Sequence, residues 1–217
     1  MRYDTWEDVA NSGFKVSLDY LNRIQSGNWP EDAFSLGQMI SKLYLVRALK
    51  NQVDWDMQQG NVFVLGCWFG QLAPLLVEEL DFQRIYGFDS DPAAIQLSEE
   101  FCEPEIRRNW RFKGVVADIN LMDWGEPEFE IDGELITDKP TLIINTSTEH
   151  MTDDWYNTVS PGTWVALQGN SDPALDGHIN TADSLSEWSD RYTMTSTVWR
   201  GEIVLPTYTR YMKIGIR

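Results

Sequence analysis

The sequence predicts an α/β protein built on a mostly parallel β-sheet. Short apolar runs that suit buried strands recur along the chain, and helical spacing of apolar residues separates several of them. Polar residues follow each run. Strands that alternate with helices form parallel sheets, because each crossover helix returns the chain to the same end of the sheet. The expected strands cover 62–65, 84–88, 112–117, 141–144 and 163–167.

The N-terminal quarter of the chain predicts helices. Apolar residues recur at loosely helical spacing over 1–26, and again over 36–49 after Ser35, a residue type that caps helices. We expect 1–59 to form a helical lid or preface to the domain of 60–217. With 217 residues and 42% hydrophobic composition, the chain suits one domain better than two.

The first strand runs into a glycine turn around which the other predicted elements are arranged. Gly66 ends the run 62–65, Gly70 closes the following loop, and leucines at helical spacing fill 72–80. Glycines let the backbone approach a ligand, and the free N-H groups of a new helix favour its anionic part. The turn therefore suits a nucleotide-like ligand, although a glycine corner without a ligand has the same pattern.

Aspartates follow the next two strands. Asp89 comes directly after the strand 84–88, about twenty residues past the glycine loop. At this spacing dinucleotide-type folds place a carboxylate on ribose hydroxyls. Plain helix capping is the alternative for Asp89, and it is the expected role of Asp91. Asp118 and Ile119 follow the third strand. Since the carboxyl ends of parallel strands share one edge, both aspartates should meet there.

The later strands also end in polar residues. An acidic stretch, 123–138, predicts a loop or a hairpin before the fourth strand, which ends at Asn145. The fifth strand follows a Pro-Gly turn and ends in Gln168 and Asn170, which suit either substrate hydrogen bonds or loop formation. Two further strands, 202–205 and 209–216, complete the chain.

The net charge and the N-terminal sequence restrict the classes of partner that we expect for this protein. The net charge is −17, from 34 acidic and 17 basic residues, and would repel a phosphate backbone, so we expect no nucleic acid partner. Met1 to Trp6 holds no apolar run long enough for a signal peptide or a membrane span, which favours a cytoplasmic protein without a membrane partner. Cys67 and Cys102 have no metal-ligand spacing, so we expect reduced thiols.

These motifs, in this order, resemble the class I S-adenosylmethionine-dependent methyltransferases. The likeness rests on the glycine loop, Asp89, Asp118-Ile119, the polar end of the fourth strand and Pro-Gly-Thr before the fifth, and it covers roughly 60–217. It implies a three-layer Rossmann-like sandwich with a mostly parallel seven-stranded sheet, a C-terminal antiparallel hairpin and N-terminal helices. It also implies S-adenosylmethionine as the cofactor.

The resemblance assigns roles to individual residues. Gly66 and Gly70 would approach the methionine moiety, Asp89 the ribose, Asp118 the adenine, and Asn145 the methyl group. The implied cofactor-binding set is Gly66, Cys67, Trp68, Gly70, Asp89, Ser90, Asp118, Ile119 and Asn145.

The chain also departs from the family pattern. The usual acid at the end of the first strand is missing, with Leu65 near its place, and Cys67-Trp68-Phe69 fill a loop that usually holds three glycines. The fourth strand lacks the Asn-Pro-Pro-aromatic sequence typical of amino methyltransferases acting on nucleic acid bases. With the acidic charge, this favours a small-molecule acceptor.

The candidate catalytic residues are His150, His178 and Asn145. Both histidines fall on loops at the expected ligand edge, where imidazole is a suitable base. Alternatively, His150 caps a helix starting near Thr152, and His178 bonds its own loop. Three residues of the N-terminal segment are candidates to close over the cofactor: Tyr20, Trp29 and Gln38.

No metal site is predicted. Glu149, His150, Asp153 and Asp154 are residue types that bind divalent ions, but adjacent positions rarely converge on one ion. The two aspartates more simply favour a helix N-terminus.

The functional expectation is methyl transfer from S-adenosylmethionine to a small molecule. The alternative is a protein that binds S-adenosylmethionine without transferring the methyl group, which the missing acid and the Trp68-Phe69 loop keep open. A nicotinamide-dependent oxidoreductase is disfavoured by the incomplete glycine pattern and the predicted terminal hairpin.

Overall fold

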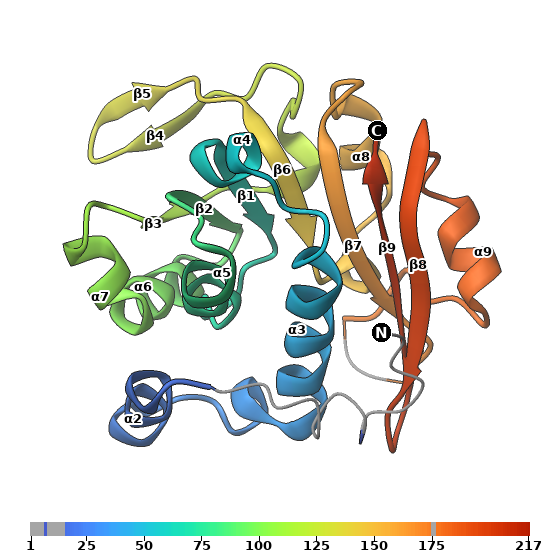
Figure 1. Cartoon of the computed structure of the whole chain (residues 1–217), viewed down its shortest axis with the longest axis horizontal. Helices are drawn as coiled ribbons and strands as arrows, with labels where there is room; N and C mark the ends of the chain where they lie inside the picture. The colour runs from blue at the N-terminus through green and yellow to red at the C-terminus, as the bar shows by residue number, and fades with distance from the viewer. Residues whose placement is uncertain (1–6, 8–15, 175–176) are drawn as a thin grey trace.

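The fold is organised around a seven-stranded sheet. A computed structural model describes residues 7, 16–174 and 177–217. The strands lie in the order β3-β2-β1-β6-β7-β9-β8, and Figure 1 shows β1 and β6 both running toward the edge near α2. Their bounds are β1 Asn61–Leu65, β2 Arg84–Asp89, β3 Phe112–Val116, β6 Pro140–Asn145, β7 Trp164–Asn170, β8 Ser196–Val204 and β9 Thr209–Ile216.

The pairing confirms the predicted sheet. Strands β3, β2, β1, β6 and β7 pair in parallel, whereas β9 is antiparallel to both β7 and β8. Strand β8 begins at Ser196, earlier than the expected 202, because a β-prone Thr-Val-Trp segment extends the pairing. The seven strands and the C-terminal hairpin therefore match the resemblance.

Helices cover both faces of the sheet and make three layers. One face packs against residues of α3, α5 and α6, and the other against residues of α8, α9 and the segment after β3. Alternate residues of β1 divide between the layers: Val62 and Val64 face the first, Phe63 and Leu65 the second. The helices among the described residues are α2 Leu18–Ser26, α3 Leu36–Leu49, α4 Trp55–Gln59, α5 Leu72–Leu80, α6 Pro92–Phe101, α7 Glu103–Arg107, α8 Asp154–Thr158 and α9 Leu185–Asp190, with 3₁₀ turns at Glu31–Phe34, Ile119–Leu121 and Thr148–His150.

The acidic stretch before β6 forms a hairpin. Strands β4, Phe129–Ile131, and β5, Glu134–Ile136, pair in antiparallel fashion outside the main sheet. Asp132 and Gly133 join them with φ values of 52° and 84°. An Asp-Gly pair with positive φ at both residues is the favoured two-residue hairpin turn.

The N-terminal segment packs beneath the ends of the strands (Figure 1). Helix α2 confirms the helical prediction over 18–26, while 1–6 and 8–15 lie outside the described residues. Ser17 caps α2 by accepting from the N-H of Tyr20, and Ser35 caps α3 by accepting from the N-H of Gln38. The predicted cap at Ser35 is therefore confirmed.

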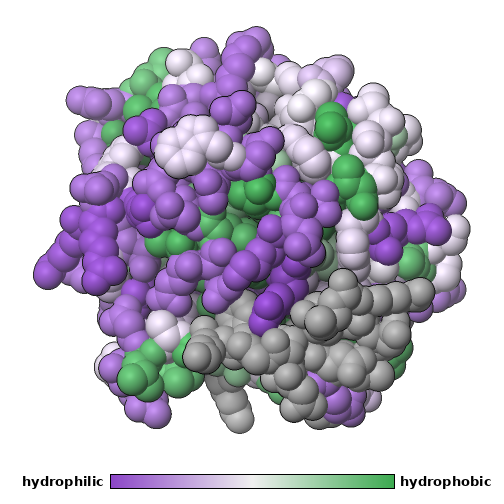
Figure 2. All heavy atoms as spheres, in the orientation of Figure 1, coloured by the Kyte–Doolittle hydropathy of each residue, from purple (hydrophilic) through white to green (hydrophobic). Residues whose placement is uncertain are grey.

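Hydrophilic residues cover most of the face drawn in Figure 2, and hydrophobic ones appear there only in small separate groups. Among the described residues, no helix is both long and apolar enough to cross a membrane. Cys67 and Cys102 are free and buried, and burial raises the pKa of both thiols. The expectation of reduced cysteines is confirmed.

Candidate functional site

A cavity of about 1070 Å³ opens at the carboxyl ends of the parallel strands. It is lined by residues at the ends of β1, β2, β3, β6 and β7, by residues of α3 and by the turn between β8 and β9. The strand order reverses between β1 and β6, and ligands of open α/β sheets bind at such switch points. The cavity wall includes Gly66, Cys67, Trp68, Asp89, Ser90, Asp118 and Ile119, all members of the predicted cofactor-binding set.

Gly66 makes the turn out of β1 in a conformation that favours glycine. Its φ is +63°, and a Cβ there would lie 3.0 Å from the Cβ of Ser147. The Ser147 hydroxyl donates a hydrogen bond of 3.3 Å to the carbonyl of Gly66. The bare backbone of Gly66 therefore forms the cavity wall between the ends of β1 and β6.

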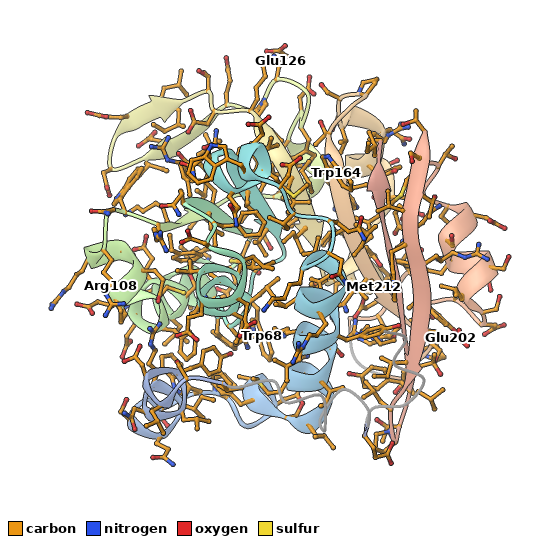
Figure 3. All side chains as sticks on the ribbon, in the orientation of Figure 1. Trp68, Arg108, Glu126, Trp164, Glu202 and Met212 are labelled. Atoms are coloured by element: carbon orange, nitrogen blue, oxygen red, sulfur yellow. The ribbon has the colours of Figure 1, made fainter. Side chains whose placement is uncertain are left out.

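Trp68 occupies the loop position after Cys67 with a left-handed backbone, φ 49°. Its N-H donates a 2.9 Å hydrogen bond to Oδ2 of Asp89, which ties the β1 loop to the end of β2. The indole lines the cavity and packs at 4.4 Å between ring centroids on Phe69, which is itself buried. Figure 3 shows Trp68 below α5, beside the N-terminal part of α3.

Asp89 is half-buried at the end of β2 and keeps acceptor capacity. Its Oδ1 accepts from the N-H of Asp91 at 3.1 Å, and Oδ2 accepts from Trp68. A carboxylate offers about four lone-pair sites, so two backbone donors leave sites free for a ligand. Asp91 accepts from the N-H of Ala93 at 2.8 Å and caps α6, which confirms its predicted role.

Asp118 opens a short 3₁₀ turn after β3. Its Oδ1 accepts from the N-H of Asn120 at 3.0 Å, and the side chain is exposed at the cavity. Ile119 is 7% exposed and gives the same wall an apolar patch. Asp89, Asp118 and Gly66 therefore border one cavity, as the sequence predicted.

Two members of the predicted set do not line the cavity, and these placements are corrected. Gly70 packs inward, because a Cβ there would lie 3.0 Å from Sγ of Cys102. Asn145 is fully buried: its Oδ1 accepts from the N-H of Ser147 at 2.9 Å, and its Nδ2 lies 3.2 Å from Sδ of Met151. Asn145 thus shapes the loop after β6 from inside.

Both predicted histidines reach the cavity wall. The rings of His150 and His178 lie 4.6 Å apart between centroids and are nearly perpendicular. Nδ1 of His150 is 3.2 Å from the carbonyl oxygen of Gly177, and Nδ1 of His178 is 2.5 Å from that of Asp172. His178 does bond its own loop, whereas α8 begins without a side-chain cap.

Of the three N-terminal residues expected to close over the cofactor, only one lines the cavity. Gln38 lines the cavity, but Tyr20 is buried and donates a 2.9 Å hydrogen bond to the carbonyl of Gln71. Trp29 donates to the carbonyl of Arg23 at 2.9 Å and packs on Phe101. The expectation that Tyr20 and Trp29 close over the cavity is wrong, because both anchor α2 to the core.

The amides at the end of β7 also divide. Asn170 lines the cavity, whereas Gln168 is fully buried and donates a 2.9 Å hydrogen bond to the carbonyl of Ser41. Of the two, Asn170 alone keeps the position expected of a substrate partner.

Sequence reasoning missed a pair of buried cations in the wall, Lys42 on α3 and Arg210 on β9. Nζ of Lys42 donates 2.6 Å to Oε1 of Gln38, and burial, assisted by the charge of Arg210, lowers the pKa of Lys42 to about 7. A lysine within the apolar spacing of α3 was the available signal. For Arg210, which lies within a buried strand, the sequence offered none.

Arg210 forms a buried ion pair with Glu149. Nη1 of Arg210 donates to Oε1 of Glu149 at 2.7 Å, and both side chains are almost fully buried. Burial disfavours the charge of Arg210, yet Glu149 and Tyr208 together leave its pKa above the usual value. The pair connects the start of β9 to the 3₁₀ turn after β6.

The fold of this chain is similar to those of solved methyltransferase structures. No protein-family model matches this sequence, and no curated protein matches it either. Magnesium protoporphyrin IX methyltransferase from Synechocystis PCC 6803 with bound S-adenosylhomocysteine (SAH) is 12% identical, with a TM-score of 0.59 over 97% of this chain and 96% of that one. The SAH-bound methyltransferase PaMTH1 of Podospora anserina is 13% identical, with a TM-score of 0.56 over 97% and 93%.

Coclaurine N-methyltransferase bound to N-methylheliamine and SAH is 15% identical, with a TM-score of 0.54 over 90% of this chain and 61% of that one. Likeness at such identity concerns the arrangement of the elements and not their chemistry. The chain therefore has the Rossmann-like, mostly parallel seven-stranded fold of these methyltransferases.

Proposed function

We propose that this protein binds S-adenosylmethionine and transfers its methyl group to a small molecule. One observation carries the proposal: Gly66, Asp89 and Asp118 come from three different strand ends and border one cavity. Solved methyltransferases of the same fold are described with SAH bound. The cofactor supplies an electrophilic methyl group, and the chain supplies the surface that orients it.

The adenosyl group is assigned to the wall formed by β2 and β3. Asp89 retains free lone pairs, which suit the two donors of a ribose diol. Asp118 offers an acceptor for an adenine amino group, and buried Ile119 beside it offers apolar contact. The bare backbone of Gly66 leaves space for the amino acid part of the cofactor.

The remaining wall is assigned to the acceptor. Ligand pockets usually occupy about 300–1,000 Å³, and this cavity of about 1070 Å³ is at the upper end of that range, which suits a site shared by a cofactor and a small acceptor. Lys42, Arg210, His150 and Tyr208 line it. These polar side chains, which include hydrogen-bond donors, suit an acceptor that carries oxygen atoms.

A second candidate is a protein that binds the cofactor without transferring its methyl group. Two observations favour it: apolar Leu65 is fully buried near the usual place of an acid, and Asn145 lies outside the cavity. Turnover separates the two functions. Release of SAH in the presence of an acceptor supports transfer, whereas tight binding without turnover supports the second candidate.

Thermal melting tests cofactor binding directly. A ligand that binds only the folded state raises Tm, and the rise grows with its concentration. We expect S-adenosylmethionine and SAH to raise Tm, and NAD to leave it unchanged. A rise with NAD alone would contradict the proposal, and no rise with either sulfur ligand would refute both candidate functions.

Asp89→Asn tests the ribose assignment. Loss of hydrogen bonds to a charged acceptor costs about 1.5–3 kcal/mol, which corresponds to about 10- to 100-fold weaker SAH binding. Asp91→Asn is the matched control, because Asn also caps α6 and Asp91 is exposed outside the cavity wall. Equal SAH affinity of the two variants, measured by calorimetry, would remove Asp89 from the site.

A further inference from the structure

A mixed cluster of potential metal ligands lies on the acceptor side of the cavity. It consists of Glu149 and His150 in the 3₁₀ turn after β6 and His178 in the loop after β7. One ligand atom from each residue lies within 4.8 Å of the others, and all three residues line the cavity. The sequence predicts no metal site, because adjacent positions such as Glu149 and His150 rarely converge on one ion, and it gives no sign that His178 joins them.

Both imidazoles are held in the tautomer that a metal needs. Nδ1 of His150 lies 3.2 Å from the carbonyl oxygen of Gly177, and Nδ1 of His178 lies 2.5 Å from that of Asp172. A carbonyl oxygen only accepts, so each Nδ1 carries the hydrogen and each Nε2 keeps its lone pair. Metal-binding histidines have this arrangement, in which a backbone carbonyl or carboxylate holds the second ring nitrogen.

The carboxylate of Glu149 has one oxygen engaged and one without a partner. Oε1 accepts from Nη1 of Arg210 at 2.7 Å and from Nδ2 of Asn170 at 2.9 Å. Oε2 is buried and has no hydrogen-bond partner among the described residues, although Glu149 is 2% exposed. A buried carboxylate oxygen left unpaired is costly, and a cation beside it would remove that cost.

We propose that Glu149, His150 and His178 bind a divalent transition metal ion, for which Zn²⁺ is the probe. Two imidazole nitrogens and one carboxylate oxygen suit such ions, and three protein ligands leave a coordination position open. Because all three residues line the cavity, an ion bound by them would be able to hold an oxygen atom of the acceptor at that position. The role toward the acceptor rests on the proposed methyl transfer, whereas binding of the ion does not.

The spacing of the three ligand atoms and the nearby charge of Arg210 indicate how tightly Zn²⁺ would bind. Zn²⁺ bonds to nitrogen and oxygen are about 2.0–2.2 Å long, so ligand atoms spread over as much as 4.8 Å must move closer together when the ion binds. The charge of Arg210 on the other carboxylate oxygen opposes a second cation nearby. We therefore expect weaker binding than at a closed structural zinc site.

Titration of the full chain with Zn²⁺ tests the site. The protein is freed of any histidine tag, treated with chelator and titrated by calorimetry. We expect one saturable ion per chain, and binding at least about tenfold weaker for His178→Gln and for His150→Gln. Co²⁺ added in place of Zn²⁺ should give visible absorption bands, and these should be lost in both variants.

The control is Asp154→Asn. This exposed carboxylate lies near the cluster in sequence but outside the cavity wall, so its loss should leave Zn²⁺ affinity unchanged. Binding that falls equally in Asp154→Asn would assign the ion to the acidic surface and overturn the proposal. Absence of saturable Zn²⁺ binding, or unchanged affinity in His178→Gln, would overturn it as well.

The failure of this inference is distinguishable from failure of the proposed function. SAH is added to the same variants in thermal melts, because the proposed assignment gives the histidines no contact with the adenosyl group. A retained SAH shift shows that His178→Gln is folded. SAH binding without Zn²⁺ binding would refute the metal site alone, and Zn²⁺ binding without SAH binding would refute the cofactor proposal alone.

Discussion

Lys42 is the residue whose ionisation the fold disturbs in the clearest way. Its pKa falls from 10.5 to about 7 on folding, first because of burial and then because of the charge of Arg210. Between these values the unfolded chain binds more protons at Lys42 than the folded chain does. The free energy of unfolding should therefore rise with pH through this window.

Lys42→Met tests this prediction. The variant should be more stable than the parent protein at pH 6.5, and the difference should shrink by about 2 kcal/mol or more toward pH 9.5, at about 1.4 kcal/mol for each unit of pKa shift. Urea denaturation at several pH values measures it. Lys50→Met, at an exposed lysine paired with Glu79, is the control and should show no such trend. A pH-independent difference for Lys42→Met would mean that this lysine keeps its ordinary pKa.

Individual residues also show how much of the site could be predicted from the sequence. Asp89, Asp118 and Gly66 were predictable, because they stand at fixed places relative to strand ends. Asn145 stands at such a place too, but its amide turns inward to the N-H of Ser147. The direction of a side chain at a strand end depends on local hydrogen bonds that spacing does not reveal.

At the scale of elements, α6 depends on its cap. Asp91 accepts from the N-H of Ala93 and satisfies one of the free donors of the first turn. Asp91→Ala should lower the free energy of unfolding by about 1 kcal/mol, whereas Asp91→Asn should keep most of it. Thermal or urea unfolding measures both, and equal stability of the two variants would show that the cap contributes nothing.

The periodicity of apolar residues predicted most strands and helices correctly. The central strands, α3 and α5 fall close to their predicted ranges, since each has apolar residues at a spacing suited to a single geometry. The extent of β8 was underestimated. Its N-terminal half is mostly exposed at the sheet edge, so it lacks the apolar run by which buried strands are recognised.

At the scale of the whole molecule, the pair of Arg210 and Glu149 links the C-terminal hairpin to the turn after β6. Arg210→Met leaves a buried carboxylate without its main partner and should cost about 3–5 kcal/mol. In the double variant Arg210→Met, Glu149→Gln no charge remains to be compensated. Its free energy of unfolding should be at least about 1 kcal/mol higher than that of the single variant Arg210→Met.

Urea denaturation in the presence of chelator measures this cycle, so that no bound ion contributes. Additive losses from Arg210→Met and Glu149→Gln would show that the two side chains are not coupled.

The sequence alone determined the layered α/β fold, the glycine turn and the aspartates at the strand ends, because periodicity and turn chemistry act within a few residues along the chain. The tertiary structure alone decided that Lys42 and Arg210 share a buried wall, and that His178 meets Glu149 and His150. These residues come from elements far apart in sequence. Their meeting depends on how the layers pack, which local patterns do not encode.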